Sequence, residues 1–243
     1  MLHPSVKKLF FEQADYYLRS DQSAGISPII FLFLNWATKH KFKRRIDICE
    51  FGGGGGLILS NIAKKYPEKI NLTNIEIVND YGLRQASKKI KFIHGSILDS
   101  KLPDKSFDAI IIRDVLHHLI GSNYKETISN QKLALKELKR LLRPNGAIFI
   151  EELVNQSQIA GRIIYELSKI NSKIGLKSKY FQISPHTIIA LLSSQKLTKI
   201  CTSVFDGKNI IYKKFQAWPN KLRFKIIHLG ALSGKQFFVI KKS

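Results

Sequence analysis

Cysteine is scarce in this sequence, and no long apolar run occurs in it. The 243 residues include two cysteines, Cys49 and Cys201, which excludes a disulfide-stapled scaffold. We expect two reduced thiols with no redox or metal role. The longest apolar stretch, residues 26–36, is interrupted by polar residues and is well short of the roughly 20 residues that span a membrane. It is therefore expected to form a buried helix, and no transmembrane segment is expected.

The first residues carry no recognisable targeting signal. Lys7 and Lys8 are followed by three apolar residues and then by Glu12 and Asp15, so the apolar core of a signal peptide is missing. We therefore expect a cytoplasmic protein.

Acidic residues are also few. The chain has 18 acidic and 40 basic residues, which gives a formal net charge of +22. The basic residues are 31 lysines and 9 arginines, whereas nucleic-acid recognition favours the arginine fork. A nucleic-acid partner and a general enrichment in lysine both explain the charge. Residues 154–243 hold 16 basic and 2 acidic side chains, so this part would attract an acidic partner.

The overall composition is that of an ordinary folded protein. Hydrophobic residues make up 44% and charged residues 24% of the chain. We find no internal repeat, low-complexity tract or linker, so a single domain over residues 1–243 is expected.

Strand-like and helix-like segments alternate from residue 46 onward. Such alternation predicts a parallel sheet with helices on both faces, whose ligands bind beyond the carboxyl ends of the strands. The predicted strands are residues 46–51, 72–77, 91–94, 108–112 and 147–150. The predicted helices are residues 57–66, residues 81–89, and a helix with an apolar stripe of Leu133, Ala134, Leu138, Leu141 and Leu142.

Five consecutive glycines, residues 52–56, join the first strand to the first helix. Without Cβ atoms, Gly52, Gly54 and Gly56 can adopt positive φ and let a ligand approach the backbone, while the helix start offers free N–H groups to an anion. A Walker loop would need Gly-Lys-Ser/Thr where Leu57 and Ile58 stand. A dinucleotide fingerprint would need a glycine at one of these two positions, which weakens the NAD interpretation.

The run Glu50-Phe-Gly-Gly-Gly-Gly-Gly56 resembles the E/D-x-G-x-G-x-G first motif of class I S-adenosylmethionine-dependent methyltransferases. Glu76, twenty residues beyond Gly56, stands where an acid of that family binds both ribose hydroxyls. Gly95-Ser-Ile97 resembles the segment that holds adenine, with Ser96 in place of the usual Asp. Residues 107–119 and 138–146 resemble two later motifs of the family.

The resemblance covers residues 45–152 and implies S-adenosyl-L-methionine as cofactor. It implies an α/β fold, a Rossmann-like seven-stranded mostly parallel sheet with helices on both faces and an antiparallel last strand at 235–241. The sixth strand would lie near 197–205. The implied parts are an N-terminal helical cap (1–44, with a helix at 9–18), the cofactor-binding core (45–152), a helical lid (153–195) and C-terminal strands with a basic aromatic insertion (196–243). The implied cofactor-binding residues are Glu50, Gly52, Gly54, Gly56, Glu76, Ile77, Ser96, Ile97 and Arg113.

The sulfonium methyl group is a strong electrophile, so the protein would mainly supply alignment. A general base helps only when the acceptor must lose a proton, and His117 or His118 is the candidate, with a purely structural role as the alternative. Asp114 is expected to cap the following helix, with polarisation of an acceptor as the alternative. Glu151 and Glu152 could contact an acceptor or form a solvated acidic pair. No metal is expected, because adjacent histidines diverge on a helix.

Three functions remain open. The first is methyl transfer to a small-molecule or lipid-like acceptor, under a lid whose stripe of Ile163, Ile164 and Leu167 covers it. The second is an RNA or nucleic-acid methyltransferase, and the third is a non-catalytic module that only binds S-adenosylmethionine. The RNA hypothesis depends on basic residues interleaved with aromatic ones: Lys208, Tyr212, Lys213, Lys214, Phe215, Trp218, Lys221, Arg223, Phe224 and Lys225. The oligomeric state is not predicted.

Overall fold

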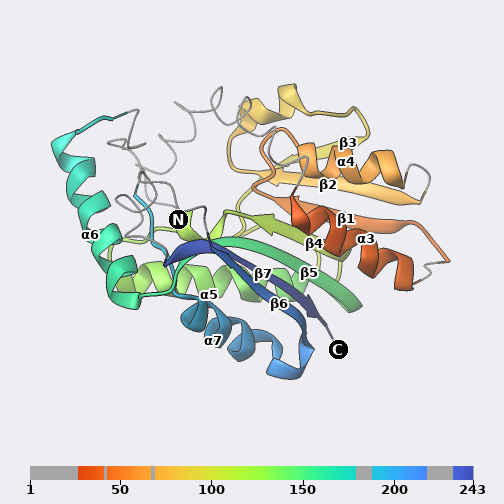
Figure 1. The fold of residues 1–243 in the computed structure, drawn as a ribbon. Helices are drawn as coiled ribbons and strands as arrows, with labels where there is room; N and C mark the ends of the chain where they lie inside the picture. The colour runs from red at the N-terminus through yellow and green to blue at the C-terminus, as the bar shows by residue number, and fades with distance from the viewer. Residues whose placement is uncertain (1–26, 41–42, 67–68, 179–187, 218–231, 243) are drawn as a thin grey trace.

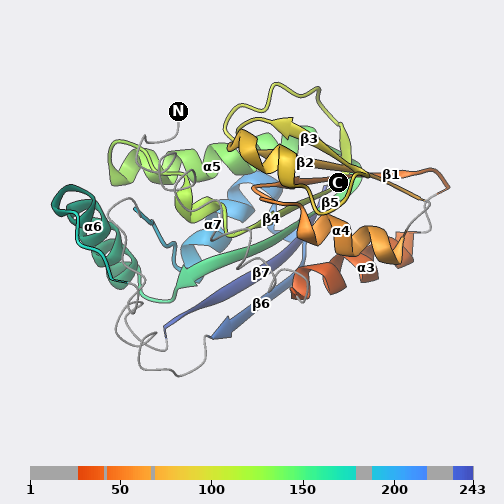
Figure 2. The same ribbon diagram turned by 90° about the horizontal axis from the view of Figure 1, so that it is seen from above.

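The computed structural model describes residues 27–40, 43–66, 69–178, 188–217 and 232–242 (Figures 1 and 2). The helices are α3 (Pro28–His40), α4 (Leu57–Lys65), α5 (Tyr124–Leu141), α6 (Gln158–Ile174) and α7 (Ser194–Phe205). The strands are β1 (Ile46–Phe51), β2 (Ile70–Glu76), β3 (Ile90–His94), β4 (Phe107–Arg113), β5 (Leu142–Asn155), β6 (Ile210–Ala217) and β7 (Ser233–Lys241). The short 3-10 helices are η2 (Asn79–Arg84), η3 (Leu116–His118) and η4 (Gly207–Asn209). The expected helix at 9–18 lies outside the described residues.

One seven-stranded sheet organises the described chain, in the order β3-β2-β1-β4-β5-β7-β6. The pairs β3-β2, β2-β1, β1-β4 and β4-β5 are parallel, whereas β7 is antiparallel to both of its neighbours. The predicted Rossmann-like fold with an antiparallel last strand is therefore confirmed. The strand order reverses direction beside β1, which places a ligand crevice at the carboxyl ends of β1, β2 and β4.

Helices cover both faces of the sheet, as predicted (Figure 2). One apolar cluster joins α3 and α4 to one face, with Phe33 and Leu59 fully buried. The other cluster joins α5 and α7 to the opposite face, with Leu138 and Cys201 fully buried. The central strand β4 is buried along most of its length, as its run of isoleucines predicts.

The expectation of a sixth strand near residues 197–205 is wrong, because this segment is helix α7. Its buried residues Leu197, Ile200, Cys201 and Val204 recur at intervals of three and four, which is the period of a helix and not of a strand. The side chain of Ser193 caps the helix by accepting from the Lys196 N–H at 3.1 Å. The sixth strand is β6, within the segment predicted to be a basic aromatic insertion.

Two helix predictions also need correction. The expected helix at 81–89 is the short 3-10 turn η2, after which Gln85 adopts an extended conformation and its side chain reaches back to the Tyr81 carbonyl. In α5, Leu133 points outward and is 48% exposed, whereas Leu135 lies in the core. The other four residues of the predicted stripe, Ala134, Leu138, Leu141 and Leu142, are buried as expected.

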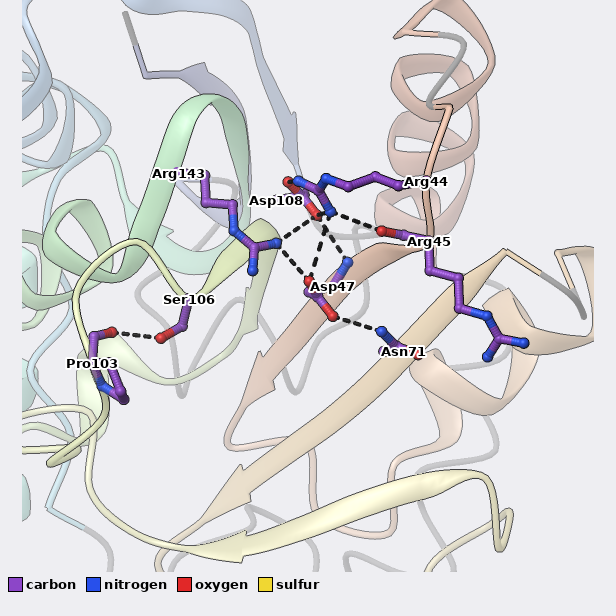
Figure 3. Close-up of polar contacts among 8 residues, drawn as sticks. All are labelled: Arg44, Arg45, Asp47, Asn71, Pro103, Ser106, Asp108 and Arg143. Atoms are coloured by element: carbon purple, nitrogen blue, oxygen red, sulfur yellow. Dashed lines mark hydrogen bonds and ion pairs between the residues drawn. The ribbon is translucent and has the colours of Figure 1, made fainter.

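A polar network ties β1 to β4 at the amino-terminal edge of the sheet (Figure 3). The buried Asp108 carboxylate accepts two hydrogen bonds from Arg44, at 2.5 and 2.8 Å, and one from Arg143 at 2.9 Å. It also accepts the backbone N–H of Asp47, whose own carboxylate accepts from Arg143 and Asn71. This edge lies opposite the ligand crevice, so the network is structural.

We expect Asp108→Asn to lower the free energy of unfolding by about 1–3 kcal/mol, because buried donors lose a charged acceptor while the partly exposed arginines recover some solvation. Urea denaturation followed by circular dichroism measures the change. The matched control is Asp104→Asn, which removes an exposed carboxylate bonded to Arg140 and should cost less than about 1 kcal/mol. Equal losses in the two variants would contradict this account.

Candidate functional site

The glycine loop between β1 and α4 makes a left-handed turn. Gly52, Gly54 and Gly56 have φ of 68°, 50° and 72°, the three positions predicted for positive φ. A Cβ on Gly52 would lie 2.7 Å from a methyl group of Val115. A Cβ on Gly53 would lie 2.6 Å from Asn74 Oδ1 and 2.7 Å from the Glu50 carboxyl carbon. Glycine is therefore required here both for conformation and for space.

Two amide side chains that sequence reasoning missed brace this loop. Asn74, fully buried in β2, donates to the Gly54 carbonyl at 2.8 Å. Gln85 donates to the same carbonyl at 3.2 Å, and the Ala86 N–H bonds the Gly55 carbonyl at 2.7 Å. Asn74 alternates with Ile70 and Leu72 on one face of β2, and a polar residue on that apolar face was the signal that could have revealed this support.

Glu76 ends β2 beside the loop and is 7% exposed. One carboxylate oxygen accepts the Gly54 N–H at 3.2 Å, and the other accepts the N–H groups of Ile77 at 2.6 Å and Val78 at 3.3 Å. Burial raises the pKa of Glu76, and the three backbone donors offset part of that effect. The carboxylate is therefore fixed to the backbone of both the glycine loop and its own strand end.

A cavity opens at the carboxyl ends of β1, β2 and β4. Glu76 and Gly52 meet there, together with Ile77, Ser96 and Ile97, all predicted as cofactor-binding residues. The Ser96 hydroxyl accepts the Leu98 N–H at 3.2 Å and so shapes its own turn. The complete lining is Phe51, Gly52, Ile75, Glu76, Ile77, Gly95, Ser96, Ile97, Asp114, Val115, His118 and Leu119.

Four predicted cofactor-binding residues lie beside the cavity and do not line it. Gly54 and Gly56 form the far side of the loop, and Glu50 lies buried beneath Gly53. The Arg113 side chain is 20% exposed, with its Nε 3.4 Å from a Glu151 oxygen and 3.9 Å from an Asp114 oxygen. Arg113 is thus held in an ion-pair cluster.

That cluster gathers charges from three strands. Lys235 of β7 bonds the Asp114 carboxylate and lies 3.5 Å from a Glu151 oxygen, which also faces Arg113. The Ser27 hydroxyl, at the start of α3, donates to the other Glu151 oxygen. Burial raises the pKa of Asp114, but the charges of Lys235, His117 and Arg113 outweigh this and hold that pKa below its usual value. Asp114 is therefore anionic at neutral pH.

Two expectations about these acids are wrong. The Asp114 side chain makes no helix cap, because Asp114 takes a left-handed φ of 56° and its carboxylate turns to Lys235. Glu151 and Glu152 form no solvated pair, since both are buried inside β5. Acidic residues can be buried in a long strand when partner side chains surround them. A single sequence does not show which side chains those partners are.

The two histidines have different surroundings. His117 is buried, and its Nδ1 lies 2.5 Å from Glu152 Oε1, while the other Glu152 oxygen accepts the Leu116 N–H at 2.7 Å. His118 lines the cavity, with its ring centroid 4.0 Å from that of His117. Burial, together with the His117 ring, holds the pKa of His118 well below its usual value. His118 is therefore neutral at pH 7, and it is a weaker base than an exposed histidine.

One group of described residues has the chemistry of metal ligands. Asp114, His117 and Glu152 place ligand atoms within 4.8 Å of one another. Two of the three already have strong partners, because His117 Nδ1 faces Glu152 and the Asp114 carboxylate bonds the Lys235 ammonium group. A cation would compete with Lys235, so the absence of a metal stays our prediction.

The predicted lid contains α6, whose N-terminus follows β5 at the carboxyl edge of the sheet (Figure 1). Of the stripe expected to cover an acceptor, Ile164 is buried, but Ile163 and Leu167 are 44% and 59% exposed. These two side chains therefore face away from the protein body. Within the described residues, no helix combines the length and apolar character needed to cross a membrane.

We expect Gly52→Ala to destabilise the protein by about 2–4 kcal/mol, since a left-handed alanine costs about 1–2 kcal/mol and its Cβ would collide with Val115. The control is Gly175→Ala at the end of α6, where φ is 86° and a Cβ meets nothing within 4 Å. This control carries the conformational strain alone, about 1–2 kcal/mol. The urea midpoints of the two variants measure their losses of stability. Equal losses would show that the collision with Val115 does not contribute.

Several solved structures have a fold similar to that of this chain. The *Burkholderia thailandensis* 1,6-didemethyltoxoflavin-N1-methyltransferase, solved with 1,6-didemethyltoxoflavin and S-adenosylhomocysteine bound, aligns with a TM-score of 0.61. The alignment covers 98% of this chain and 88% of that one, at 14% sequence identity. At this identity the likeness concerns the fold.

Sequence comparison finds methyltransferases that resemble parts of this chain. An uncharacterized methyltransferase of *Mycobacterium tuberculosis* is 26% identical over 112 residues, which are 45% of this chain and 52% of that protein, so the match spans about half of the relative's length. The cephaeline 6'-O-methyltransferase of *Carapichea ipecacuanha* is 27% identical over 158 residues, 65% of this chain and 41% of that enzyme. Residues 49–150 match the family model described as a methyltransferase domain. Residues 49–150 of the chain are therefore similar to methyltransferase domains.

Proposed function

We propose that this chain is an S-adenosylmethionine-dependent methyltransferase that transfers a methyl group to a small-molecule acceptor by in-line displacement. The observation that carries the proposal is the position of the Glu76 carboxylate, buried at the cavity and bonded to the backbone of the glycine loop. An acid so placed is an acceptor for ribose hydroxyls, and the adjacent loop leaves space where side chains would otherwise stand.

The residues present fit this cofactor. A carboxylate offers about four lone-pair directions, and the backbone donors of Gly54, Ile77 and Val78 occupy three of them, so Glu76 retains capacity for a hydroxyl. A Cβ built on Gly54 would find its nearest neighbour 3.8 Å away, in Tyr81, which leaves the loop surface open. Ile77, Ile97 and Leu119 supply apolar walls suited to an adenine ring.

When bound, S-adenosylmethionine supplies an electrophilic sulfonium methyl group. The chain itself would then hold the two reactants in line and keep water out. His118 is the residue placed to accept a proton from an acceptor, because it is neutral and lines the cavity. His117, held by Glu152 and packed against His118, would act by fixing the position of that ring.

The names of two similar enzymes support a small-molecule acceptor, and a lipid-like acceptor remains part of the same proposal. The solved neighbour and the plant relative carry names of enzymes that methylate small molecules. At the identities found, these names support the class of acceptor and not its identity.

Some of the basic residues behind the nucleic-acid hypothesis have another structural explanation. Lys213 and Lys214 are exposed on β6, the edge strand, while Phe215 packs against the core. Charged residues on an edge strand prevent it from pairing with another chain. The strand β6 lies three strands from β4, about 14 Å across the sheet at the usual spacing, so it does not border the cavity. Residues 218–225 of this hypothesis lie outside the described residues.

Calorimetry tests the proposal directly. We expect S-adenosylmethionine and S-adenosylhomocysteine to bind and NAD not to bind. Glu76→Ala should weaken S-adenosylhomocysteine binding about 10- to 150-fold through the lost hydroxyl bond, because a hydrogen bond to a charged group contributes about 1.5–3 kcal/mol. Glu137→Ala, which removes a carboxylate bonded to Ser100 and Arg140 outside the cavity, should leave binding unchanged. Binding of NAD alone would refute the proposal.

Transfer of a radiolabelled methyl group to pooled phenols, amines, thiols and carboxylic acids separates an enzyme from a module that only binds the cofactor. Cofactor binding without transfer to any acceptor class would favour the non-catalytic alternative. Transfer to RNA and not to the pooled small molecules would favour the nucleic-acid alternative.

The pH dependence of binding follows from the raised pKa of Glu76. The carboxylate is a stronger acceptor for a ribose hydroxyl than the neutral carboxyl group, so protonation on acidification weakens this hydrogen bond. Affinity for S-adenosylhomocysteine should therefore fall as pH decreases, beginning above the ordinary glutamate pKa of 4.5. Calorimetry between pH 5 and pH 8 measures this, and Glu76→Gln should bind weakly at every pH. An unchanged affinity of the native protein across this range would contradict the role given to Glu76.

A further inference from the structure

The outward face of α6 is apolar. Five large aliphatic side chains, separated by four, four, three and four residues, lie on one side of the helix and are between 44% and 75% exposed. They are Ile159, Ile163, Leu167, Ile170 and Ile174, and Leu176 follows them at 62% exposed. We call these six residues the α6 stripe. A helix of a globular protein normally turns such a stripe toward the core.

The inward face of α6 explains why the stripe stays outside. Gly161 is buried, and a Cβ there would lie 2.6 Å from the Leu191 carbonyl oxygen. Ala160, Ile164 and Tyr165 complete the buried side. Rolling the helix would move a larger residue into the place of Gly161, where the backbone of residue 191 leaves no space. Packing at Gly161 therefore fixes the rotation that leaves the stripe in solvent.

Cations border the stripe. Residues 158–177 contain four cations, Arg162, Lys169, Lys173 and Lys177, against one carboxylate, Glu166. Arg162 pairs with Glu166 at 2.9 Å and lies over the Tyr124 ring, and Lys169 donates to the Ser122 carbonyl, so the cations offered to a ligand are Lys173 and Lys177. The helix stands at the outer end of the molecule, beyond the carboxyl ends of the strands, in both views (Figures 1 and 2). An apolar stripe flanked by lysines on an exposed helix is the pattern of a segment that lies in a membrane interface.

We propose that the α6 stripe is a docking surface for an anionic phospholipid bilayer, with the helix lying in the headgroup region and the flanking cations on acidic headgroups. The charge decides against a second copy, because two such faces would bring like charges together on chains of net charge +22. The composition decides against an ordinary protein partner, since protein interfaces are enriched in aromatic residues and depleted in lysine. This inference does not depend on the proposed enzyme activity.

Sedimentation of the full chain with vesicles tests the proposal. We expect binding to phosphatidylglycerol/phosphatidylcholine vesicles and little binding to pure phosphatidylcholine. Ile163→Gln/Ile170→Gln should lower partitioning at least about tenfold, whereas the control Leu83→Gln/Leu133→Gln, which alters exposed leucines elsewhere, should not. Circular dichroism melting verifies that each variant folds. Absence of binding, or equal loss in both pairs, would overturn the proposal.

A charge series separates the helix from the general basicity of the chain. Each lysine near an anionic surface contributes about fivefold to binding, so Lys173→Glu/Lys177→Glu should reduce partitioning more than tenfold. Lys64→Glu/Lys65→Glu makes the same change in net charge at the end of α4 and should have a small effect. If the two pairs lose equally, binding is non-specific and the assignment to α6 fails.

A fluorescent label gives a readout that needs no loss of function. Both native thiols are buried, so a polarity-sensitive probe on Leu167→Cys reports from the stripe. Its emission should shift to the blue with anionic vesicles, and a probe on Leu133→Cys should not respond. A shift that follows protein concentration without vesicles would identify a second copy as the occupant and overturn the proposal.

Discussion

The left-handed turn of the glycine loop is the constraint on which the site depends. Three positive φ values in five residues reverse the chain within a short distance, so α4 begins directly above the end of β1. Two side chains of β2 hold this turn. Asn74 donates to the Gly54 carbonyl, and Glu76 accepts the Gly54 N–H. The neighbouring strand thus positions the loop that faces the ligand.

The two edges of the sheet use buried acids differently. At the amino-terminal edge, Asp108 is saturated by two arginines and a backbone N–H and serves to join strands. At the carboxyl edge, Glu76 and Asp114 border the cavity, where a ligand can still reach them. The acid at the amino-terminal edge therefore joins strands through ion pairs. The acids at the carboxyl edge border the cavity, where they can accept hydrogen bonds from a ligand.

The sequence predicted the parallel part of the fold well, because buried strands without alternation and a glycine loop are local signals. The positive φ at Gly52, Gly54 and Gly56 followed from the absence of side chains. The helix at Ser194–Phe205 was misread, since a family expectation was preferred to the spacing of Leu197, Ile200 and Val204. The partners of Asp114 and Glu151 could not be predicted, because Lys235 reaches them from a strand more than eighty residues away in the chain. Long-range pairs of this kind leave no periodic pattern in one sequence.

The insertion of β7 between β5 and β6 has a consequence for synthesis on the ribosome. All nine residues of β5 from Ala147 to Asn155 pair with β7, so the outer edge of β5 has no partner until Ser233 and its successors are made. At about 5–20 residues per second, the 78 residues from 155 to 233 take about 4–16 s. During that interval the outer edge of β5, with Phe149 and Ile150 beside the central Glu151 and Glu152, has no strand to pair with. An unpaired edge can pair with another chain, and the cluster around Lys235 forms only when β7 closes this edge.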